Sequence, residues 1–577
     1  MQVLNKYPVE KNPLFAYINN DSALGFDIPD VSMFGMIKIS AESHPDALAY
    51  EYYGAKCTYK ELIERIEKVS NAYFDLGVRK GDIVTILMPN TPESVISIYA
   101  LNRIGAVCNI VHPLSAQEEI KNYILSSGSE FLLAIDLCCK KVNEIIDKTN
   151  LKKVIVASAG ETMPPVMKLA YKLTNKNKNS FPKTDSRYLT WAAFIKGAKE
   201  RVPSYKPVGI QNEAAAILLH SGGTTGTPKD IMLSNKNFNA FGMQAIITLY
   251  DVSVGDKILA ILPIFHGFGL GVCIHVSFCF GACSVLIPSF DSKKFGSIIK
   301  KYKPTMLFGV PTLYEAMVNS KGLDGFDFSF LKYAVSGGDS LPKPLENRVN
   351  KFLEEHNSDV RICEGYGMTE GLAALSLSVY DGYKSGTIGK PLIGNEMCVV
   401  KPGTTEVLPA NTEGELCVTG PTVMIGYRDN EVETQKTLRH HADGKLWLHT
   451  GDMATIDSDG FVKYELRIKR LIISSGYNVY PTQIEKVIEE IPKVLKCAVV
   501  SMPHPYKKEV AKAYIILENG CNSDNKMLEE IKEHCKKHLA HHSVPYAYEF
   551  VSELPKTPYG KVDFLKLQKE TAIAANQ

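Results

Sequence analysis

The residue types best suited to phosphate chemistry lie in one segment rich in glycine and threonine, residues 221–229. It reads Ser221, Gly222, Gly223, Thr224, Thr225, Gly226, Thr227, Pro228 and Lys229. Glycine lets the backbone approach an anion closely, so that consecutive N–H groups can surround it. The threonine hydroxyls add donors and Lys229 adds a positive charge. The apolar run before it, Ala214–Leu219, predicts a strand that delivers the loop to a sheet edge. The segment is therefore predicted to bind phosphate.

The spacing in this segment excludes the phosphate loop of P-loop nucleotidases. That pattern requires Gly, Lys and Ser or Thr in immediate succession. Here Thr227 and Pro228 separate Gly226 from Lys229, and Asp230 follows the lysine. From this loop alone, a flexible turn without a ligand remains the alternative.

Further motifs follow the loop in a fixed order. They are residues 262–267 (LPIFHG), 336–339 (SGGD), 364–370 (EGYGMTE), 414–416 (GEL), 450–452 (TGD), 467–469 (RIK), 475–477 (SGY) and 555–561 (PKTPYGK). Together with the loop they resemble the adenylate-forming superfamily, which contains acyl- and aryl-CoA synthetases, firefly luciferase and the adenylation domains of peptide synthetases. The resemblance runs from about Thr58 to Lys561, nearly the whole chain.

This resemblance implies an ATP-dependent ligase that works in two steps. A carboxylate is a poor acyl donor, because its leaving group would be an oxide. Attack of the carboxylate on the α-phosphate of ATP gives an acyl-adenylate, and AMP is then a competent leaving group for a thiol. The site must hold two anions together and neutralise the developing charge. The implied substrates are a carboxylic acid, ATP and coenzyme A, with Mg²⁺ as cofactor.

The resemblance also implies a role for individual residues. Lys561 bridges the substrate carboxylate and the α-phosphate, and Glu370 binds Mg²⁺, which prefers carboxylate oxygen. Tyr366 stacks on adenine, while Asp452 and Arg467 contact the ribose. Catalytic contributions are also expected from Thr224 and His266. The remaining residues expected at ATP or CoA are Ser221, Gly222, Gly223, Thr225, Gly226, Lys229, Gly338, Asp339, Glu364, Gly365, Gly367, Thr369, Lys469 and Gly476.

The second step implies a movement of the tail. In this family a small domain rotates about the residue two positions after the arginine, here Lys469. Rotation would withdraw Lys561 and bring the loop around Gly476 to the thiol channel. The expected domains are residues 1–466, which bind ATP and the acid, and residues 467–577, which are mobile.

The motif around His266 narrows the class of carboxylic acid that the enzyme is expected to use. Amino-acid-activating relatives commonly carry Asp after the corresponding phenylalanine, whereas Phe265-His266 resembles acyl- and aryl-CoA ligases. Glu364-Gly365-Tyr366 resembles fatty acyl-CoA synthetases, and the neighbouring glycines are expected to leave room for an alkyl chain. We therefore expect a medium- or long-chain fatty acid. The alternatives are an aryl-CoA ligase, an acyl-AMP ligase that loads a carrier protein, and a catalytically weak nucleotide-binding regulatory relative.

Three positions depart from the family pattern. Asp230 replaces the usual glycine after the loop lysine, Leu466 replaces the glycine before the hinge arginine, and Asp563 stands where a basic residue is common. We expect Asp230 to point outward, away from the phosphates.

Hydrophobic periodicity predicts the elements that carry these motifs. Thr58 and Glu61 form a capping box for a helix that Gly77 ends. Strands are predicted at 82–88 and 106–111, around a helix from Pro92 to about Arg103, which indicates a parallel βαβ unit. In the tail we predict a helix at 483–491, strands at 497–502 and 513–517, and a helix capped by Ser523. The fold class is α/β: a large N-terminal domain of α/β layers with a β-rich subdomain, plus a small mobile α+β C-terminal domain.

Composition excludes several classes. A net charge of +2 over 577 residues is too small to indicate nucleic-acid binding. The 13 cysteines are odd in number and form no CxxC pair, so reduced thiols in the cytoplasm are expected. The N-terminus lacks the apolar core of a signal peptide. Residues 258–290 carry no Asp, Glu, Lys or Arg but contain Pro263, two histidines and four glycines, which favours a buried strand, loop, helix and strand over a membrane span.

The region from Pro164 to Arg187 is polar and rich in lysine. A solvated insertion is the favoured interpretation, with weak contact to an anionic membrane through Lys168, Lys172, Lys176 and Lys178 as the alternative. A monomer or a homodimer is expected.

Overall fold

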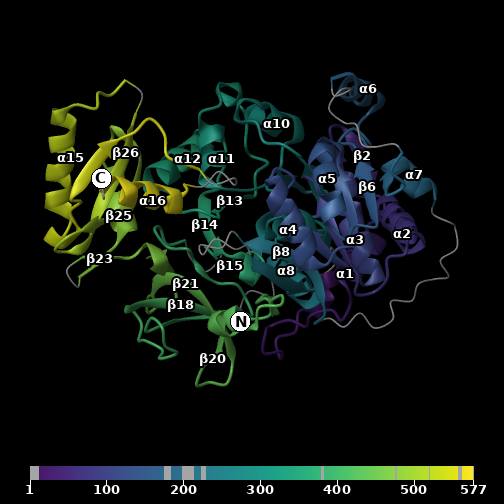
Figure 1. The fold of residues 1–577 in the computed structure, drawn as a ribbon, viewed down its shortest axis with the longest axis horizontal. Coiled ribbons are helices and arrows are strands. Elements are labelled where there is room, and N and C mark those ends of the chain that lie inside the picture. The colour runs from purple at the N-terminus through teal and green to yellow at the C-terminus, as the bar shows by residue number, and fades with distance from the viewer. Residues whose placement is uncertain are drawn as a thin grey trace.

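The computed structural model describes residues 12–174, 184–197, 213–221, 229–378, 383–474, 477–518, 520–556 and 562–575. Two large sheets with helices packed around them form the bulk of the protein, a smaller antiparallel sheet lies beneath them, and the C-terminal elements form one end of the molecule (Figure 1).

The first sheet has the strand order β19-β9-β8-β4-β3-β5-β6-β7 and carries the loop after residue 221. Strands β4, β3, β5, β6 and β7 run parallel, β8 is parallel to β4, and β9 is antiparallel to β8. The strands are β3 (Ile83–Leu87), β4 (Val107–Ile110), β5 (Phe131–Ile135), β6 (Lys153–Ala157), β7 (Tyr188–Thr190), β8 (Ala215–Ser221), β9 (Lys229–Ser234) and β19 (Gly426–Tyr427). The helices of this part of the chain are α2 (Tyr59–Leu76), α3 (Pro92–Ile104), α4 (Gln117–Ser127), α5 (Cys139–Ile145), α6 (Pro165–Thr174), α7 (Trp191–Lys196) and α8 (Asn235–Thr248).

The second sheet has the order β16-β15-β14-β13-β12-β10-β11-β1-β2. Its strands are β1 (Leu48–Tyr52), β2 (Ala55–Thr58), β10 (Lys257–Ala260), β11 (Cys283–Leu286), β12 (Met306–Gly309), β13 (Tyr333–Gly337), β14 (Ile362–Gly367), β15 (Ala374–Leu377) and β16 (Lys390–Pro391). The associated helices are α1 (Met33–Ser43), the π-helix η5 (Phe268–Val276), α9 (Ser277–Phe280), α10 (Phe295–Tyr302), α11 (Pro311–Val318) and α12 (Lys343–Glu355). One continuous hydrophobic core joins the first two sheets.

The third sheet has the order β17-β18-β21-β20, with β22 paired to β21. Its elements are β17 (Glu396–Val400), β18 (Glu413–Thr419), α13 (Glu431–Thr437), β20 (Leu438–His440), β21 (Leu446–Ile456) and β22 (Val462–Arg467). It corresponds to the β-rich subdomain that the sequence motifs imply.

The C-terminal elements surround a separate sheet, β24-β23-β26-β25 with β27 beside β26, and have hydrophobic cores of their own. They are β23 (Ile472–Ser474), β24 (Tyr477–Val479), α14 (Pro481–Glu489), β25 (Val494–His504), β26 (Lys508–Leu517), α15 (Asn525–His538), β27 (Ala547–Phe550) and α16 (Phe564–Ala575). Short 3-10 turns complete the chain: η2 (Pro13–Tyr17), η3 (Asp136–Cys138), η4 (Ile146–Lys148), η6 (Ser292–Lys294), η7 (Lys321–Leu323), η8 (Thr369–Gly371), η9 (Ile468–Arg470) and η10 (His541–Ser543).

The predicted βαβ unit is confirmed, because β3 and β4 pair in parallel and α3 connects them. The predicted helix before this unit is confirmed as well. Thr58 and Glu61 form the capping box of α2, and Gly77 ends the helix with a φ of 108°, a conformation that favours glycine. The cap predicted at Ser523 is wrong, because the carboxylate of Asp524 accepts from the Met527 N–H and begins α15 one residue later.

The apolar stretch 258–290 forms β10, η5, α9 and β11 inside the fold, as expected. No helix within the described ranges is long and apolar enough to cross a membrane. Residues 165–174 of the predicted insertion form α6, a helix that buries none of its residues.

Candidate ATP and acid site

The ends of β8 and β14 and the middle of β21 carry the sequence motifs. Strand β8 ends at Ser221 and β9 begins at Lys229, so the glycine- and threonine-rich loop connects two antiparallel neighbours. The turn η8, which carries Thr369 and Glu370, contacts β8. The Met424 N–H donates to the carbonyl of Glu370 at 2.8 Å, and the Ile425 N–H donates to Met232 in β9 at 3.0 Å. The backbone therefore ties the turn to β9, the strand that follows the loop.

Glu370 is held by a tyrosine. Tyr427 donates its hydroxyl to Glu370 Oε1 at 2.9 Å, and the carboxylate is 9% exposed. Lys229 lies above the Tyr427 ring, with its Nζ 4.5 Å from the ring centroid, and pairs with Glu433 at 2.7 Å. Lys229 thus lies beside the tyrosine that binds Glu370, and its charge is matched by Glu433 on α13.

Asp452 is held by a second tyrosine. Tyr366 donates its hydroxyl to Asp452 Oδ2 at 2.6 Å, and Arg467 Nε lies 3.1 Å from Oδ1. The arginine is poorly aligned for a hydrogen bond, so Oδ1 is a buried acceptor whose hydrogen-bonding capacity is unused within the described part of the chain. The register of β21 with β22 places Asp452 opposite Arg467.

Burial raises the pKa of Asp452 above its usual range, although Arg467 and the Tyr366 hydroxyl favour the carboxylate. The charge of Glu370 raises it further, so the two carboxylates lie within electrostatic reach of each other. Asp452 in turn raises the pKa of Arg467. The cluster combines two acids, two tyrosines and an arginine, which suits a polyhydroxylated, phosphate-bearing ligand.

Glu364 joins two motifs. The Leu341 N–H donates to Glu364 Oε1 at 3.0 Å, which fastens β14 to the turn that carries Gly338 and Asp339. Gly338 has a φ of 78°, while Gly338 and Asp339 are exposed. Burial raises the pKa of Glu364 to about 7.

The glycines near the acid motif permit close backbone packing. A Cβ on Gly267 would lie 1.5 Å from the carbonyl oxygen of Leu372, and one on Gly367 would lie 1.6 Å from that of Ala373. A Cβ on Gly365 would meet the Leu377 side chain at 3.0 Å. Gly267 and Gly367 therefore serve close backbone packing, and the expectation that the glycines beside Glu364-Gly365-Tyr366 leave room for an alkyl chain stays a prediction.

Asp230 points into the protein, so the expectation of an outward side chain is also wrong. Its Oδ1 lies 2.9 Å from His220 Nδ1, and its Oδ2 accepts from Ser126 at 2.9 Å. The other ring nitrogen of His220 lies 2.7 Å from Asn109 Oδ1. The Asn109 amide nitrogen donates to Thr85, Tyr123 and Ser127, which fixes Oδ1 as an acceptor.

Both ring nitrogens of His220 face acceptors, Asp230 on one side and Asn109 on the other. Burial opposes ionisation of Asp230, but the hydrogen bond and charge of His220 hold its pKa below the usual value. The cross-strand pairing of His220 with Asp230 in β8 and β9 brings the two together.

The other two residues that depart from the family pattern, Leu466 and Asp563, contribute to local structure. Leu466 is fully buried in β22 opposite Met453. Asp563 accepts from the Lys566 N–H at 3.0 Å and so caps the start of α16.

Comparison with known proteins identifies the family. Residues 37–428 match the family described as AMP-binding enzyme, and residues 483–561 match its C-terminal domain. The chain belongs to the AMP-binding enzyme family.

Its relatives cover the whole chain. It is 31% identical over 564 residues to a long-chain-fatty-acid–CoA ligase of Bacillus subtilis, covering 97% of this chain and 98% of the relative. A long-chain-fatty-acid–CoA ligase of Salmonella typhimurium is 30% identical over 579 residues, covering 98% of both. Among solved structures, an ATP-bound RpMatB-BxBclM chimera has a TM-score of 0.81 at 25% identity, covering 93% of this chain and 98% of the other. The predicted fold class and superfamily are confirmed.

In this AMP-binding enzyme, Phe265 of the acid motif packs against a histidine that the sequence analysis did not single out. His112, directly after β4, stacks on Phe265 with ring centroids 3.9 Å apart, and the two border a small cavity with Tyr123 and His220. Burial, assisted by Lys141, lowers the pKa of His112 to about 4, so this ring is neutral. His266 is half-buried, with its ring 5.0 Å from that of Phe265.

Some predicted site residues of the enzyme lie outside the described residues. They are Gly222, Gly223, Thr224, Thr225, Gly226, Gly476 and Lys561, together with the side chains of Ser221 and Lys469. Lys469 belongs to η9, directly after Arg467 and Ile468.

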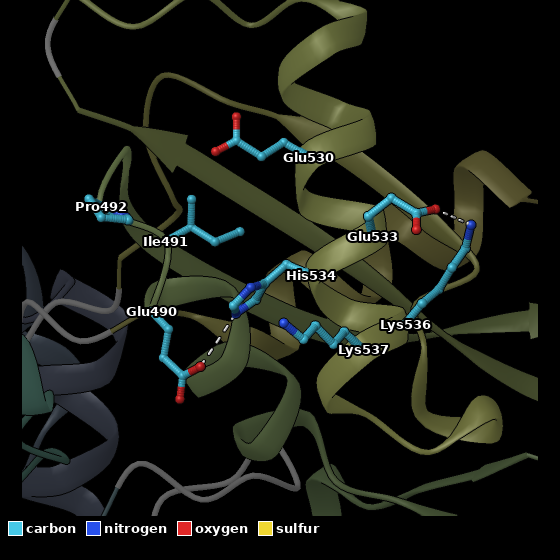
Figure 2. A pocket seen from close by; sticks show the side chains of 8 residues that line it. All are labelled: Glu490, Ile491, Pro492, Glu530, Glu533, His534, Lys536 and Lys537. Atoms are coloured by element: carbon cyan, nitrogen blue, oxygen red, sulfur yellow. Dashed lines mark hydrogen bonds and ion pairs between the residues drawn. The ribbon is translucent and has the colours of Figure 1, made fainter.

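A shallow groove of about 680 Å³ lies on the C-terminal elements, away from these residues. Figure 2 shows that side chains of α15 and of the segment after α14 line it, with Glu490 directed at His534 and Glu533 at Lys536. His534 Nε2 lies 3.4 Å from Glu490, and Lys536 pairs with Glu533 at 2.6 Å. Its lining includes none of the residues predicted to bind ATP or the acid.

Proposed function

We propose that this AMP-binding enzyme is an ATP-dependent acyl-CoA ligase. It converts a carboxylic acid and ATP to an acyl-adenylate and pyrophosphate, and then transfers the acyl group to coenzyme A. The observation that carries the proposal is Asp452, a buried carboxylate fixed by Tyr366. Its other oxygen lies 3.1 Å from Arg467 Nε and accepts no hydrogen bond within the described residues. Such an acceptor suits the paired hydroxyls of a ribose.

The residues around Asp452 divide the work on ATP. Asp452 accepts the ribose hydroxyls, Arg467 limits the repulsion between that carboxylate and the phosphates, and Tyr366 offers a ring for adenine. The loop 221–229 surrounds the phosphates with N–H and hydroxyl donors. Lys561 holds the acid against the α-phosphate, so that the carboxylate oxygen attacks phosphorus and pyrophosphate leaves.

Glu370 fits a Mg²⁺ ligand. Tyr427 occupies Oε1, and within the described ranges Oε2 accepts no hydrogen bond, which leaves one carboxylate oxygen for a hard cation. The ion, when bound, neutralises charge on the phosphates. The Tyr427 contact fixes the direction in which that oxygen points.

For the second step we propose a hinge at Lys469 between domains 1–466 and 467–577. Arg467 pairs with Asp452 of the third sheet, whereas Arg470 pairs with Glu485 of α14 at 2.5 Å. The ion pairs of the chain therefore pass from the third sheet to the C-terminal elements within η9. Rotation there would replace Lys561 by the loop around Gly476 and open the acyl carbon to the thiol.

We propose a medium- or long-chain fatty acid as the substrate. The curated relatives are named long-chain-fatty-acid–CoA ligases, and the chain spans their full length. An aryl acid is the alternative, and the solved anthranilate CoA ligase shares the fold. A carrier protein as acceptor, and a weak regulatory relative, are separate outcomes of the test below.

The test measures both half-reactions. Acid-dependent exchange of pyrophosphate into ATP should occur with Mg²⁺, and thioester should form once coenzyme A is added. Acetate, octanoate, palmitate and benzoate distinguish the acids, and Asp452→Asn serves as the inactive control. Exchange without CoA thioester would indicate a carrier-protein ligase, and absence of exchange with every acid would refute the proposed activity.

We also infer weak peripheral contact with anionic membranes through α6. Val166, Leu169 and Leu173 lie on one face of this helix and are 82%, 60% and 67% exposed. Lys168 and Lys172 belong to the same helix. An apolar face beside basic residues is typical of a helix that lies in a lipid interface.

Sedimentation with vesicles tests this contact. Wild type should bind vesicles that contain anionic lipid more strongly than neutral vesicles, and Leu169→Glu should reduce that binding. Ile573→Glu, which changes an equally exposed residue on α16, should have no effect. Equal binding by the Leu169 variant would contradict the inference.

A further inference from the structure

The third sheet contains a cluster of potential metal ligands that the proposed reaction does not use. Cys417 lies on β18, His449 on β21, and His441 directly after β20. They are 0%, 5% and 6% exposed, and their ligand atoms lie within 4.8 Å of one another. Because three separate strands supply them, no sequence spacing reveals the group.

The two histidines face each other through one nitrogen each. His449 Nδ1 lies 3.1 Å from Glu415 Oε2 and donates to it, which in the neutral ring leaves the lone pair on Nε2. That Nε2 lies 3.0 Å from His441 Nε2. Either a single proton links the two rings, or both lone pairs point at a cation.

The surroundings of His441 leave this buried ring short of partners. Its Nδ1 is buried and has no hydrogen-bond partner in the described part of the chain. In water a neutral imidazole would satisfy both nitrogens, so burying the ring against one neighbour has a cost. A strong ligand bond at Nε2 offsets that cost.

We propose that Cys417, His441 and His449 bind a divalent transition-metal ion, with Zn²⁺ favoured by the ligand set. One thiolate and two imidazoles are typical zinc ligands, at about 2.3 Å and 2.0–2.1 Å from the metal. Two imidazole nitrogens on one tetrahedral ion lie roughly 3.3 Å apart, close to the observed separation. On binding, the Cys417 thiol releases its proton to solvent and the thiolate takes up the ion.

Charge and outer-shell contacts are also suited to this ion. The thiolate of Cys417 and the carboxylate of Glu415 together balance a charge of +2. A carboxylate that orients a metal-binding histidine is a common outer-shell partner. Cys398 lies opposite Cys417 in the β17–β18 register, so the fourth position is open to its thiol or to water.

The site would brace the turn that carries Asp452. Glu415 uses its second oxygen, Oε1, to accept from the Gly451 N–H at 3.3 Å. Thr450 donates to the carbonyl of Leu416 at 2.7 Å and accepts from the Asp452 N–H at 3.1 Å. An ion on His449 would thereby stiffen the segment 449–452. This effect on ATP rests on the proposed function, whereas metal binding does not.

Metal content tests the site directly. Tag-free protein, purified with a non-chelating reductant and analysed by mass spectrometry, should hold about one zinc ion per chain. Cys417→Ser combined with His441→Gln should lose it. Cys521→Ser combined with His534→Gln is the matched control from the C-terminal elements and should retain it. Glu415→Gln should weaken zinc affinity about 10–100-fold, since it perturbs only the outer shell.

A second measurement needs no ligand variant and so is unaffected by misfolding. Trp447 stacks on His441 with centroids 5.1 Å apart, and the only other tryptophan is Trp191. In Trp191→Phe protein stripped of metal, Co²⁺ should quench the remaining fluorescence with one-to-one stoichiometry and produce thiolate–cobalt absorption.

The proposal is overturned if wild type holds no metal and stoichiometric Co²⁺ leaves Trp447 unchanged. It is equally overturned if the Cys417/His441 variant keeps its zinc. Metal binding without acid-dependent exchange would uphold the site and refute only the ligase.

Discussion

Replacing Tyr366 by phenylalanine removes a single hydroxyl from the candidate ATP site. That hydroxyl donates to Asp452 Oδ2 at 2.6 Å, and burial together with the neighbouring carboxylate raises the pKa of Tyr366 well above its ordinary value. The tyrosine therefore remains a donor at every relevant pH. The ring, which is the surface proposed for adenine, is retained in the variant.

The size of the effect follows from the charge of the acceptor. A hydrogen bond to a charged group contributes about 1.5–3 kcal/mol, and about 1.4 kcal/mol corresponds to one pKa unit. Losing the donor should therefore raise the pKa of Asp452 further above its usual range, where burial already places it. The carboxylate is the form that accepts ribose hydroxyls, so activity is lost as pH falls through this pKa. The acid limb should move to higher pH.

The assay is the pH dependence of kcat/KM for ATP, measured by pyrophosphate exchange at saturating acid. Tyr464→Phe is the matched control, because its ring lies 6.2 Å from that of Tyr366 and the chemical change is the same. Tyr366→Phe should shift the acid limb upward, and Tyr464→Phe should leave it in place. Overlapping profiles for wild type and Tyr366→Phe, or an equal shift in both variants, would refute the reasoning.

Four further predictions address other parts of the molecule. Lys561→Ala should abolish acyl-adenylate formation yet leave thiolysis of preformed acyl-adenylate largely intact, measured as separate half-reactions; equal loss of both would exclude the bridging role. Lys469→Pro should slow thiolysis more than adenylation, and unchanged overall turnover would count against the hinge. Burial raises the pKa of Glu364 to about 7, so its contribution to stability is present below its unfolded pKa and is lost as pH rises toward 7. Glu364→Gln should flatten the pH dependence of the unfolding free energy in that window. An unchanged pH dependence would contradict this prediction. Asp230→Ala removes the acceptor that faces the buried Nδ1 of His220, so it should lower the unfolding free energy by about 1–3 kcal/mol in denaturant titrations, whereas a change near zero would disprove a stabilising His220–Asp230 contact.

The sequence predicted the architecture because its local signals agree with the tertiary fold. The capping box at Thr58, the glycine stop at Gly77 and the strands around α3 are decided by neighbours a few residues apart. The apolar stretch 258–290 was placed inside the fold from its glycines, proline and histidines. Motif order alone was sufficient to indicate the family, since each motif is short and local.

The orientation of single side chains could not be predicted in this way. Asp230 was expected to face solvent, yet its pairing across β8 and β9 places it against His220. The glycines at 267 and 367 belong to motifs that are visible in the sequence, but only the structure shows that a Cβ there would meet the backbone of Leu372 and Ala373. The cap of α15 moved by one residue, because Ser523 and Asp524 are both suitable and only geometry selects between them.

By itself, the sequence determined which residue types are available and in what order: a loop predicted to bind phosphate, two carboxylates and two lysines, in the order of an adenylate-forming enzyme. Tertiary structure alone decided which of these groups act as a unit. Tyr366 with Asp452, Tyr427 with Glu370, and Cys417 with His441 and His449 are each separated along the chain and meet only when strands pair. The physical reason is that a local pattern specifies an element, whereas sheet register and packing specify which side chains lie within hydrogen-bonding distance.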